Sequence, residues 1–315
     1  MTARSLLDRT GTLLGLILVA AIFGTLVGHQ FFAPGNVELM ARQAAIVCMA
    51  ALGMTVVIAT GGIDLSVGSI IALSTVVIAL VLRLDQPPLV AAMAGVGAAA
   101  ICGAINGLII TQIRVVPFIV TLGTMLVLRG AAKGLADERR IEAPFTWLND
   151  LLRTTPGTLL PGGIWLVIVL ALIVAGVLRY TRFGRHVLAI GSNERMARLC
   201  GIAISRTKVM VYTISAALAG MAGLLQFSKL SVGDPTVAIG LELDVIAAVI
   251  IGGGSLTGGR GTVLGTIIGA AIMTVIQIGC SQKGLPNWVQ QIVTGGIIVI
   301  AVALDRVRSS RASWR

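Results

Sequence analysis

A stretch of glycine, aspartate and serine, GGIDLSVGS at residues 61–69, interrupts an otherwise almost continuous apolar sequence. An unpaired acid is costly to bury within a membrane, so Asp64 marks a candidate functional position. Its carboxylate is expected to cap the following helix through the backbone amides of Ser66 and Val67. Alternatively, the break dips into a pathway through the membrane, where its exposed amides and hydroxyls would offer hydrogen bonds. The two roles are compatible, and we favour capping at the cytoplasmic mouth of a pathway.

A second polar stretch, LSVGDPT at residues 230–236, is the mirrored candidate on the outer side. Glu242 and Asp244 begin the helix after it, where acids interact favourably with the helix dipole. Few charges lie inside the apolar segments, namely Arg42, Arg129 and Asp64. The candidate pathway or helix-break residues of the two stretches are Gly61, Gly62, Asp64, Ser66, Gly68, Ser231 and Asp234.

The densest polar stretch is residues 180–208, and seven Lys and Arg lie in it or directly before it, from Arg179 to Lys208. Within it, SNERMARLCGI predicts a short helix with Ser192 or Asn193 as the cap, Glu194 in the first turn and Gly201 at the end. A short capped helix on the membrane surface can dock into a groove of a partner protein. The alternative is a solvated connector that only supplies positive charge.

The composition around these stretches is that of an integral membrane protein. Of the 315 residues, 56% are hydrophobic and 12% are charged, and the mean hydropathy is +0.97; ordinary soluble domains are about 25% charged. Segments of about twenty apolar residues are long enough to cross a bilayer core of about 30 Å, and in lipid they must be helices. We interpret the first segment as a retained helix rather than a signal peptide. Hydropathy predicts ten spans, at residues 11–28, 39–60, 66–83, 89–112, 116–135, 161–180, 207–227, 241–252, 261–280 and 287–304.

Basic residues are unevenly divided between the two sides of this ten-span arrangement. With the N-terminus inside, fifteen Lys and Arg fall on the inner side and seven on the outer side. The positive-inside rule therefore places both termini in the cytoplasm. The net charge of +11 is explained by this topology and by anionic lipid headgroups, and it requires no nucleic-acid partner.

The sequence also contains short motifs that occur twice and suggest an internal repeat. LSVG occurs at residues 65–68 and again at 230–233, an offset of 165, and IVTLG at 119–123 resembles IVTGG at 292–296. If each copy has five helices, the second copy runs in the opposite sense, as in many transporters. We therefore expect an all-α membrane domain over residues 1–315, with inverted repeats at about 11–135 and 161–304. Chance similarity among apolar helices is the alternative.

Three motifs in order, GGIDLSVGSIIALS, FGRHVLAIGSNERMARLCGI and LELDVIAAVIIGGGSLTGGRGTVLG, resemble the permease subunit of bacterial ATP-binding-cassette importers for ribose, arabinose and galactose. The resemblance covers essentially the whole chain. It implies a second permease chain, identical or related, a separate ATPase, and a periplasmic sugar-binding protein. This family usually has two adjacent alanines after the asparagine, where this chain has Met196 and Ala197.

The resemblance also implies that the loop at about 181–206 rests on the ATPase. Two glycines in it allow sharp entry turns, at Gly184 and Gly191. The candidate coupling residues are Gly184, Gly191, Asn193, Glu194, Ala197 and Gly201.

ATP hydrolysis is not expected in this chain. The string nearest to a phosphate-binding loop, GSLTGGRG at residues 254–261, has arginine in place of the required lysine and reads as a turn between helices. No catalytic residue, metal ligand or cofactor is expected. The substrate stays open between a monosaccharide and another small polar solute, such as a branched-chain amino acid, a nucleoside or a signalling sugar. An ion-coupled secondary transporter is a further alternative, which would need a chain of titratable residues across the membrane.

Overall fold

The computed structural model describes residues 3–154 and 160–313, and almost all of them are helical. Ten of the described helices overlap the ten apolar ranges expected from the sequence: α1 (Ala3–Val27), α2 (Pro34–Ala59), α3 (Val67–Arg83), α4 (Pro88–Gln112), α5 (Pro117–Leu135), α6 (Gly162–Tyr180), α9 (Ile204–Leu230), the short α10 (Leu241–Ile251), α11 (Val263–Gln282) and α12 (Asn287–Ser313). Shorter elements connect them: η1 (His29–Phe32), β1 (Ile141–Glu142), η2 (Trp147–Asp150), α7 (Arg182–Ser192), α8 (Glu194–Leu199) and β2 (Val232–Gly233).

Six of the described helices, α2, α4, α5, α6, α9 and α11, are long and apolar enough to cross a membrane. Three further apolar stretches are shorter, within α1, within α12 and over the whole of α3. The chain is therefore a multi-pass membrane protein. With eleven residues, α10 extends about 17 Å and covers roughly half of a bilayer core.

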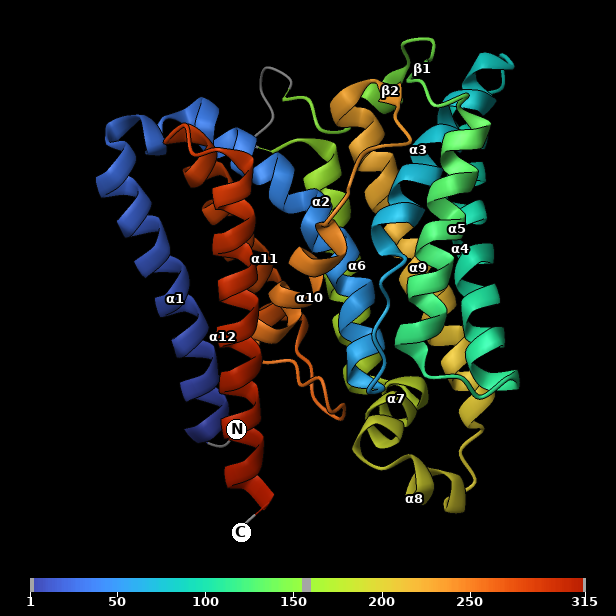
Figure 1. Cartoon of the computed structure of the whole chain (residues 1–315), viewed down its shortest axis with the longest axis vertical. Coiled ribbons are helices and arrows are strands. Elements are labelled where there is room, and N and C mark those ends of the chain that lie inside the picture. Colours follow the sequence, from blue (N-terminus) through green and yellow to red (C-terminus); the bar gives the residue numbers. More distant parts are fainter. Residues whose placement is uncertain (1–2, 155–159, 314–315) are drawn as a thin grey trace.

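The connections divide between the two ends of the helical bundle (Figure 1). The start of α1, the end of α12 and the α7–α8 segment lie at one end, while β1 and β2 lie at the other. Here β1 and β2 form a short antiparallel pair, with Ile141 opposite Gly233. The basic loop and both terminal helices thus share an end, as the charge distribution predicts.

Helices α2 and α9 form the centre of the bundle and pack against each other. Nearly all of α2 from Ala45 to Ala59 is buried. Small residues permit close approach to α9: a methyl group on Gly53 of α2 would lie 2.8 Å from the backbone of Ser215, and one on Gly107 of α4 would lie 2.7 Å from that of Val209. Such contacts drive association in lipid, where apolar burial alone does not favour helix pairing.

The helices around this centre pack in matching pairs. On one side α3 contacts α4, α5 and α9, and on the other α10 contacts α11, α12 and α2. Likewise α4 packs against α9, and α11 packs against α2. The outermost helices depart from the pattern, because α1 packs against α11 whereas α6 packs against α2.

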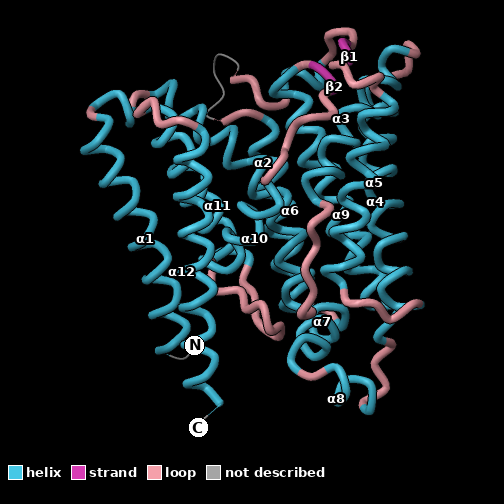
Figure 2. Tube along the Cα trace, in the orientation of Figure 1, coloured by secondary structure: helices cyan, strands magenta, loops and turns pink. Residues whose placement is uncertain are grey.

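Two chain segments leave the helical pattern inside the bundle. Residues 62–66 rise in extended form from the end of α2, near α7, to the start of α3, as Figure 2 shows. Residues 234–240 descend from β2 to the start of α10 (Figure 1). Both α3 and α10 therefore begin within the bundle rather than at one of its ends. We call these segments the first break and the second break.

The two LSVG motifs do not lie at equivalent positions in the fold. Leu65 precedes helix α3, whereas Leu230 is the last residue of α9. An offset of 165 is therefore the wrong register for comparing the two halves, because identity over four small or apolar residues carries little structural information.

Candidate functional site

The α7–α8 segment is built from two capped helices. Thr181 precedes α7 and accepts a hydrogen bond from the amide of Gly184 at 3.2 Å. Asn193 separates the helices and caps α8 by accepting from the amide of Met196 at 3.0 Å. The short helix expected here is present, with Asn193 rather than Ser192 as its cap and Glu194 in its first turn.

The end of α8 is closed by Gly201, which has a φ of +79°. Its amide donates to the carbonyl of Arg198, and the next amide, of Ile202, donates to the carbonyl of Ala197. This pattern satisfies carbonyls that a helix end leaves free, and a left-handed φ favours glycine. The end of α8 is therefore encoded locally, as expected.

The expectation for Gly184 and Gly191 is wrong, because both lie inside α7 rather than in turns. Their role is close packing: a methyl group on Gly184 would collide with the backbone of Leu178 at the end of α6. Helix α7 itself was not expected from the sequence. The apolar side chains of Phe183, Val187 and Ile190 have helical spacing, and this signal could have revealed it.

Charged side chains tie α8 to the start of α9. Lys208 donates to Glu194 at 2.7 Å, and Arg198 donates to the same carboxylate at 3.4 Å. Partial burial raises the pKa of Glu194, but these two cations outweigh it and hold the pKa below its usual value. A hollow of about 620 Å³ beside them is lined by Glu194, Arg195, Arg198 and Leu199. With 81% of its surface exposed, Leu199 offers an apolar contact to a partner.

Three distant parts of the chain meet at the end of α7. We call this place the glycine junction and define it by Gly191, Gly258 and Gly259. The amide of Gly259 donates to the carbonyl of Ala59, the last residue of α2, at 3.0 Å. A methyl group on Gly191 would collide with that same carbonyl and with the amide of Gly259. A methyl group on Gly258 would lie 2.6 Å from the carbonyl of Gly191 and 2.9 Å from the amide of Gly61.

The glycine junction therefore joins the α7–α8 segment directly to the start of the first break. It also joins both to the turn at residues 252–262, which connects α10 with α11. Backbone contacts through glycine leave no flexible side chain to absorb a displacement. The junction thus holds the end of α7 in backbone contact with the end of α2 and with the turn that follows α10.

The first break is organised by Asp64, whose side chain is completely buried. One carboxylate oxygen accepts from the amide of Ser66 at 2.9 Å and from its hydroxyl at 2.6 Å. The expected bond to the amide of Val67 is wrong, because Ser66 is the residue that precedes α3 and Asp64, two residues earlier, holds the turn into the helix rather than its first amides. Asn106 of α4 donates to the same hydroxyl at 3.0 Å. At its lower end, Gly61 has a φ of +77°, and a methyl group on Gly62 would lie 2.5 Å from the Tyr212 hydroxyl.

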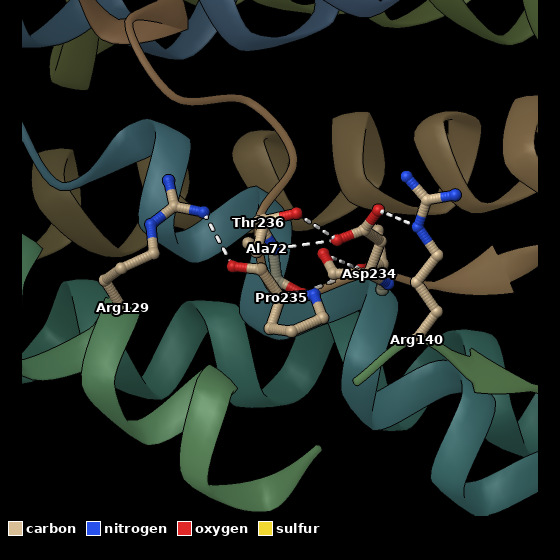
Figure 3. Close-up of polar contacts among 7 residues, drawn as sticks. Ala72, Arg129, Arg140, Asp234, Pro235 and Thr236 are labelled. Carbon is tan, nitrogen blue, oxygen red and sulfur yellow. Dashed lines mark hydrogen bonds and ion pairs between the residues drawn. The ribbon is translucent and has the colours of Figure 1, made fainter. Parts of the chain in front are cut away.

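The second break is organised by Asp234 in the same way (Figure 3). Its Oδ1 accepts from the amide of Thr236 at 2.8 Å and from the hydroxyl at 2.6 Å, and its Oδ2 accepts from Arg140 Nε at 2.8 Å. Its amide donates to the hydroxyl of Thr75 in α3 at 3.2 Å. Ser231, a candidate of the same stretch, ends α9 in the left-handed region with a φ of +60°.

One face of α5 holds both breaks. Thr121 donates to the carbonyl of Ile63 at 3.2 Å, and the carbonyl of Met125 accepts from the hydroxyl of Ser69 at 2.8 Å. Eight residues after Thr121, Arg129 donates to the carbonyls of Pro235 and Val237 at 3.0 and 2.7 Å (Figure 3). Residues spaced by four lie on the same face of a helix. These contacts, together with Asn106 and Arg140, were not expected from the sequence.

The starts of α3 and α10 meet between the two breaks. A methyl group on Gly68, in the first turn of α3, would collide with the carbonyl of Ala238 and with the carboxylate of Glu242. The other oxygen of Glu242 accepts from the amide of Gly240 at 3.2 Å. The Glu242 carboxylate thus lies at two helix N-termini, where helix dipoles favour negative charge. The carboxylate of Asp244 does not share these contacts and accepts a hydrogen bond from the side chain of Gln277 in α11.

Residues 36–302, which contain every residue of the junction and of both breaks, match a family described as "Branched-chain amino acid transport system / permease component". The chain belongs to this family.

Among curated proteins, the permease is 38% identical over 299 residues to the ribose import permease protein of Escherichia coli (strain K12), covering 93% of this chain and 92% of the relative. It is 40% identical over 313 residues to that of Bacillus subtilis (strain 168), covering 96% and 94%. The fructose import permease protein of Rhizobium meliloti is 33% identical over 303 residues, covering 93% and 84%. A comparison with solved structures returned no match.

Proposed function

We propose that this chain is the transmembrane permease subunit of an ATP-binding-cassette importer for a monosaccharide. The observation that carries the proposal is whole-length similarity to import permeases named for ribose, allose and fructose. The permease family supplies a membrane pathway rather than an enzyme. The energy would come from ATP hydrolysed on a separate ATPase subunit, and the sugar from a periplasmic binding protein.

The α7–α8 segment is the proposed contact with the ATPase. It projects from one end of the bundle, and its apex presents the exposed apolar side chain of Leu199 beside a charged hollow. The glycine junction gives this segment a rigid connection to both halves of the bundle. The coupling residues Gly191, Asn193, Glu194 and Gly201 therefore act by shaping and fixing the segment.

Two inverted five-helix repeats account for the arrangement of the helices. The starts of α2 and α9 lie 170 residues apart, as do the ends of α4 and α11 and the starts of α5 and α12. The two central helices run in opposite directions, since α2 descends towards α7 and α9 rises from α8 to β2 (Figure 1). The matched packing of α3 and α10 supports the same relationship.

The pathway is proposed to open where the starts of α3 and α10 meet. Discontinuous helices whose N-termini meet within the membrane are a recurrent feature of transporter binding sites. The face of α5 that bonds to both breaks would keep their movements coordinated. Asp64 is enclosed by its own chain, which favours the capping role over direct contact with sugar.

Orientation follows from the charge distribution. The end that carries α7, α8 and the two terminal helices is proposed to face the cytoplasm, and the β1–β2 end the periplasm. The working importer would contain two permease chains, identical or related, in the bacterial inner membrane.

A branched-chain amino acid is the alternative substrate, because it appears in the description of the family. Reconstitution decides between them: the permease is placed in liposomes with its ATPase and binding protein, and uptake of ribose, allose, fructose and leucine is measured. We expect ATP-dependent uptake of one sugar. Uptake of leucine without any sugar would overturn the proposal.

A further inference from the structure

A small pocket at the β1–β2 end of the bundle belongs to neither the coupling segment nor the breaks. Its volume is about 290 Å³. We call it the outer cationic pocket; it is lined by Arg42, Phe145, Asn149, Leu152, Arg153, Ser228, Lys229 and Ser231. Its charged lining residues are three cations, supplied by α2, by α9 and by the loop after η2.

The pocket contains nitrogen donors without acceptors. Among the described residues, Arg42 Nε and Asn149 Nδ2 are buried and have no hydrogen-bond partner. The Asn149 residue as a whole is only 5% exposed. The remaining buried side-chain atoms without partners are oxygens. A buried donor left unsatisfied costs about 1–3 kcal/mol, so two in one cationic pocket point to an oxyanion that accepts from both.

The acidic neighbours do not fill this role. Glu38 pairs with Arg42 through the guanidinium Nη2 and accepts a second bond from Thr154, so it leaves Nε free. Asp150 lies 3.7 Å from Arg153. Lys229 donates to the neutral side chain of Gln43. The pocket thus retains net positive charge.

The positions of two cations indicate where the anion comes from. Arg42 is the last charged residue of α2, and the following 17 residues to Ala59 carry no charge. Lys229 lies at the end of α9. No charged residue occurs between it and Lys208, which lies near the start of the same helix. Cations at the ends of uncharged membrane helices lie at the level of the lipid headgroups. A soluble partner would contact the loops above this level.

We propose that the outer cationic pocket binds the phosphate group of an anionic phospholipid. The volume fits a headgroup rather than a whole lipid, whose acyl chains would lie along the apolar helices. Two lipid oxygens would accept from Arg42 Nε and Asn149 Nδ2, and Lys229 and Arg153 would neutralise the remaining charge. The bound headgroup would link the start of α2 to the end of α9, the two central helices.

The test is native mass spectrometry of the purified full-length chain with phosphatidylglycerol and, separately, zwitterionic phosphatidylethanolamine. We expect one phosphatidylglycerol to be retained preferentially. The Lys229→Gln variant should weaken its binding by about tenfold, the usual effect of losing one charge-assisted hydrogen bond. The Asn149→Asp variant should weaken it as strongly, because it keeps the oxygen that accepts from the amide of Thr146 but turns the free donor into an acceptor.

Arg83→Gln is the matched control, because Arg83 is an exposed cation at the same end of the bundle and outside the pocket. It should retain phosphatidylglycerol as the unmodified chain does. The proposal is overturned if both lipids bind equally, or if the two pocket variants retain the lipid. It is also overturned if inorganic phosphate raises the melting temperature as much as the lipid does. Weaker association with the binding protein, with lipid retention unchanged, would instead assign the pocket to that protein. Sugar uptake is not needed for any of these measurements.

Discussion

Asp64 and Asp234, 170 residues apart, make the same pair of hydrogen bonds. Each carboxylate accepts from the amide and from the hydroxyl of the residue two positions later, Ser66 in one case and Thr236 in the other. Each lies in a non-helical segment that leads to a helix starting inside the bundle. The offset of 170 also separates the starts of α2 and α9, so the two acids occupy equivalent places in the proposed repeats. Their shared role is to hold a break in shape.

Asp64→Asn should give a folded permease with near-normal uptake. The asparagine oxygen still accepts from Ser66, and its volume is almost unchanged. Asp64→Ala removes the acceptor and should destabilise the chain by about 1 kcal/mol or more, as loss of a cap does. Thermal unfolding and ATP-driven sugar uptake are measured on both purified variants. A loss of uptake above about tenfold in Asp64→Asn, at normal stability, would contradict the capping role and assign Asp64 to the pathway.

Gly191→Ala should uncouple ATP hydrolysis from transport. The added methyl group collides with the carbonyl of Ala59 and the amide of Gly259, so α7 must move away from the glycine junction. We expect membrane insertion to persist, while uptake falls by at least about tenfold, as a distant misplacement of about 1 Å can cost more. ATPase activity and uptake are measured together in liposomes.

The control for this variant is Gly176→Ala in α6, where an added methyl group meets no atom within 4 Å. It should behave as the unmodified permease does. Normal uptake in Gly191→Ala would mean that the junction tolerates displacement and does not transmit movement.

Local chemistry was sufficient to predict part of this arrangement. Long apolar segments with few charges revealed the membrane-spanning helices, and Asn193 and Gly201 marked α8 because caps act within a few residues. Gly191 was misread as a turn residue, since its partner Ala59 is 132 positions away and only the fold brings them together. The same reason explains why the bonds of Arg129 to the second break were missed. Residue identity at LSVG pairs positions that differ in the fold, whereas the repeats proposed from the helix boundaries have an offset of 170.

Labelling of single cysteines should establish the orientation. In a chain without its native cysteines, Arg198→Cys in α8 should react with an impermeant thiol reagent only from the cytoplasm. Asp150→Cys in η2 should react only from the periplasm. Both side chains are exposed enough to react, at 65% and 44%. Right-side-out and inside-out vesicles provide the two conditions, and the reversed pattern would overturn the proposed topology.

The ion pair of Arg140 and Asp234 should make stability depend on pH in acid. Burial raises the pKa of Asp234, but the hydroxyl and amide of Thr236 and the guanidinium of Arg140 outweigh it, so the pKa lies below the ordinary 3.8. A group whose pKa is lowered by folding stabilises the folded state fully above its unfolded value, and this contribution is lost as the pH falls through the folded value.

Asp234→Asn keeps the acceptor for Thr236 and removes the charge that faces Arg140. We therefore expect its melting temperature to lie below that of the unmodified permease at neutral pH and down to about pH 5. Below pH 3.8 the difference should shrink, because the aspartate of the unmodified chain becomes neutral as well. Asp137→Asn, at an exposed acid before β1, should show neither effect. A difference that stays constant from neutral pH into acid would mean that the carboxylate charge does not stabilise the second break, and that the bonds to Thr236 alone hold it.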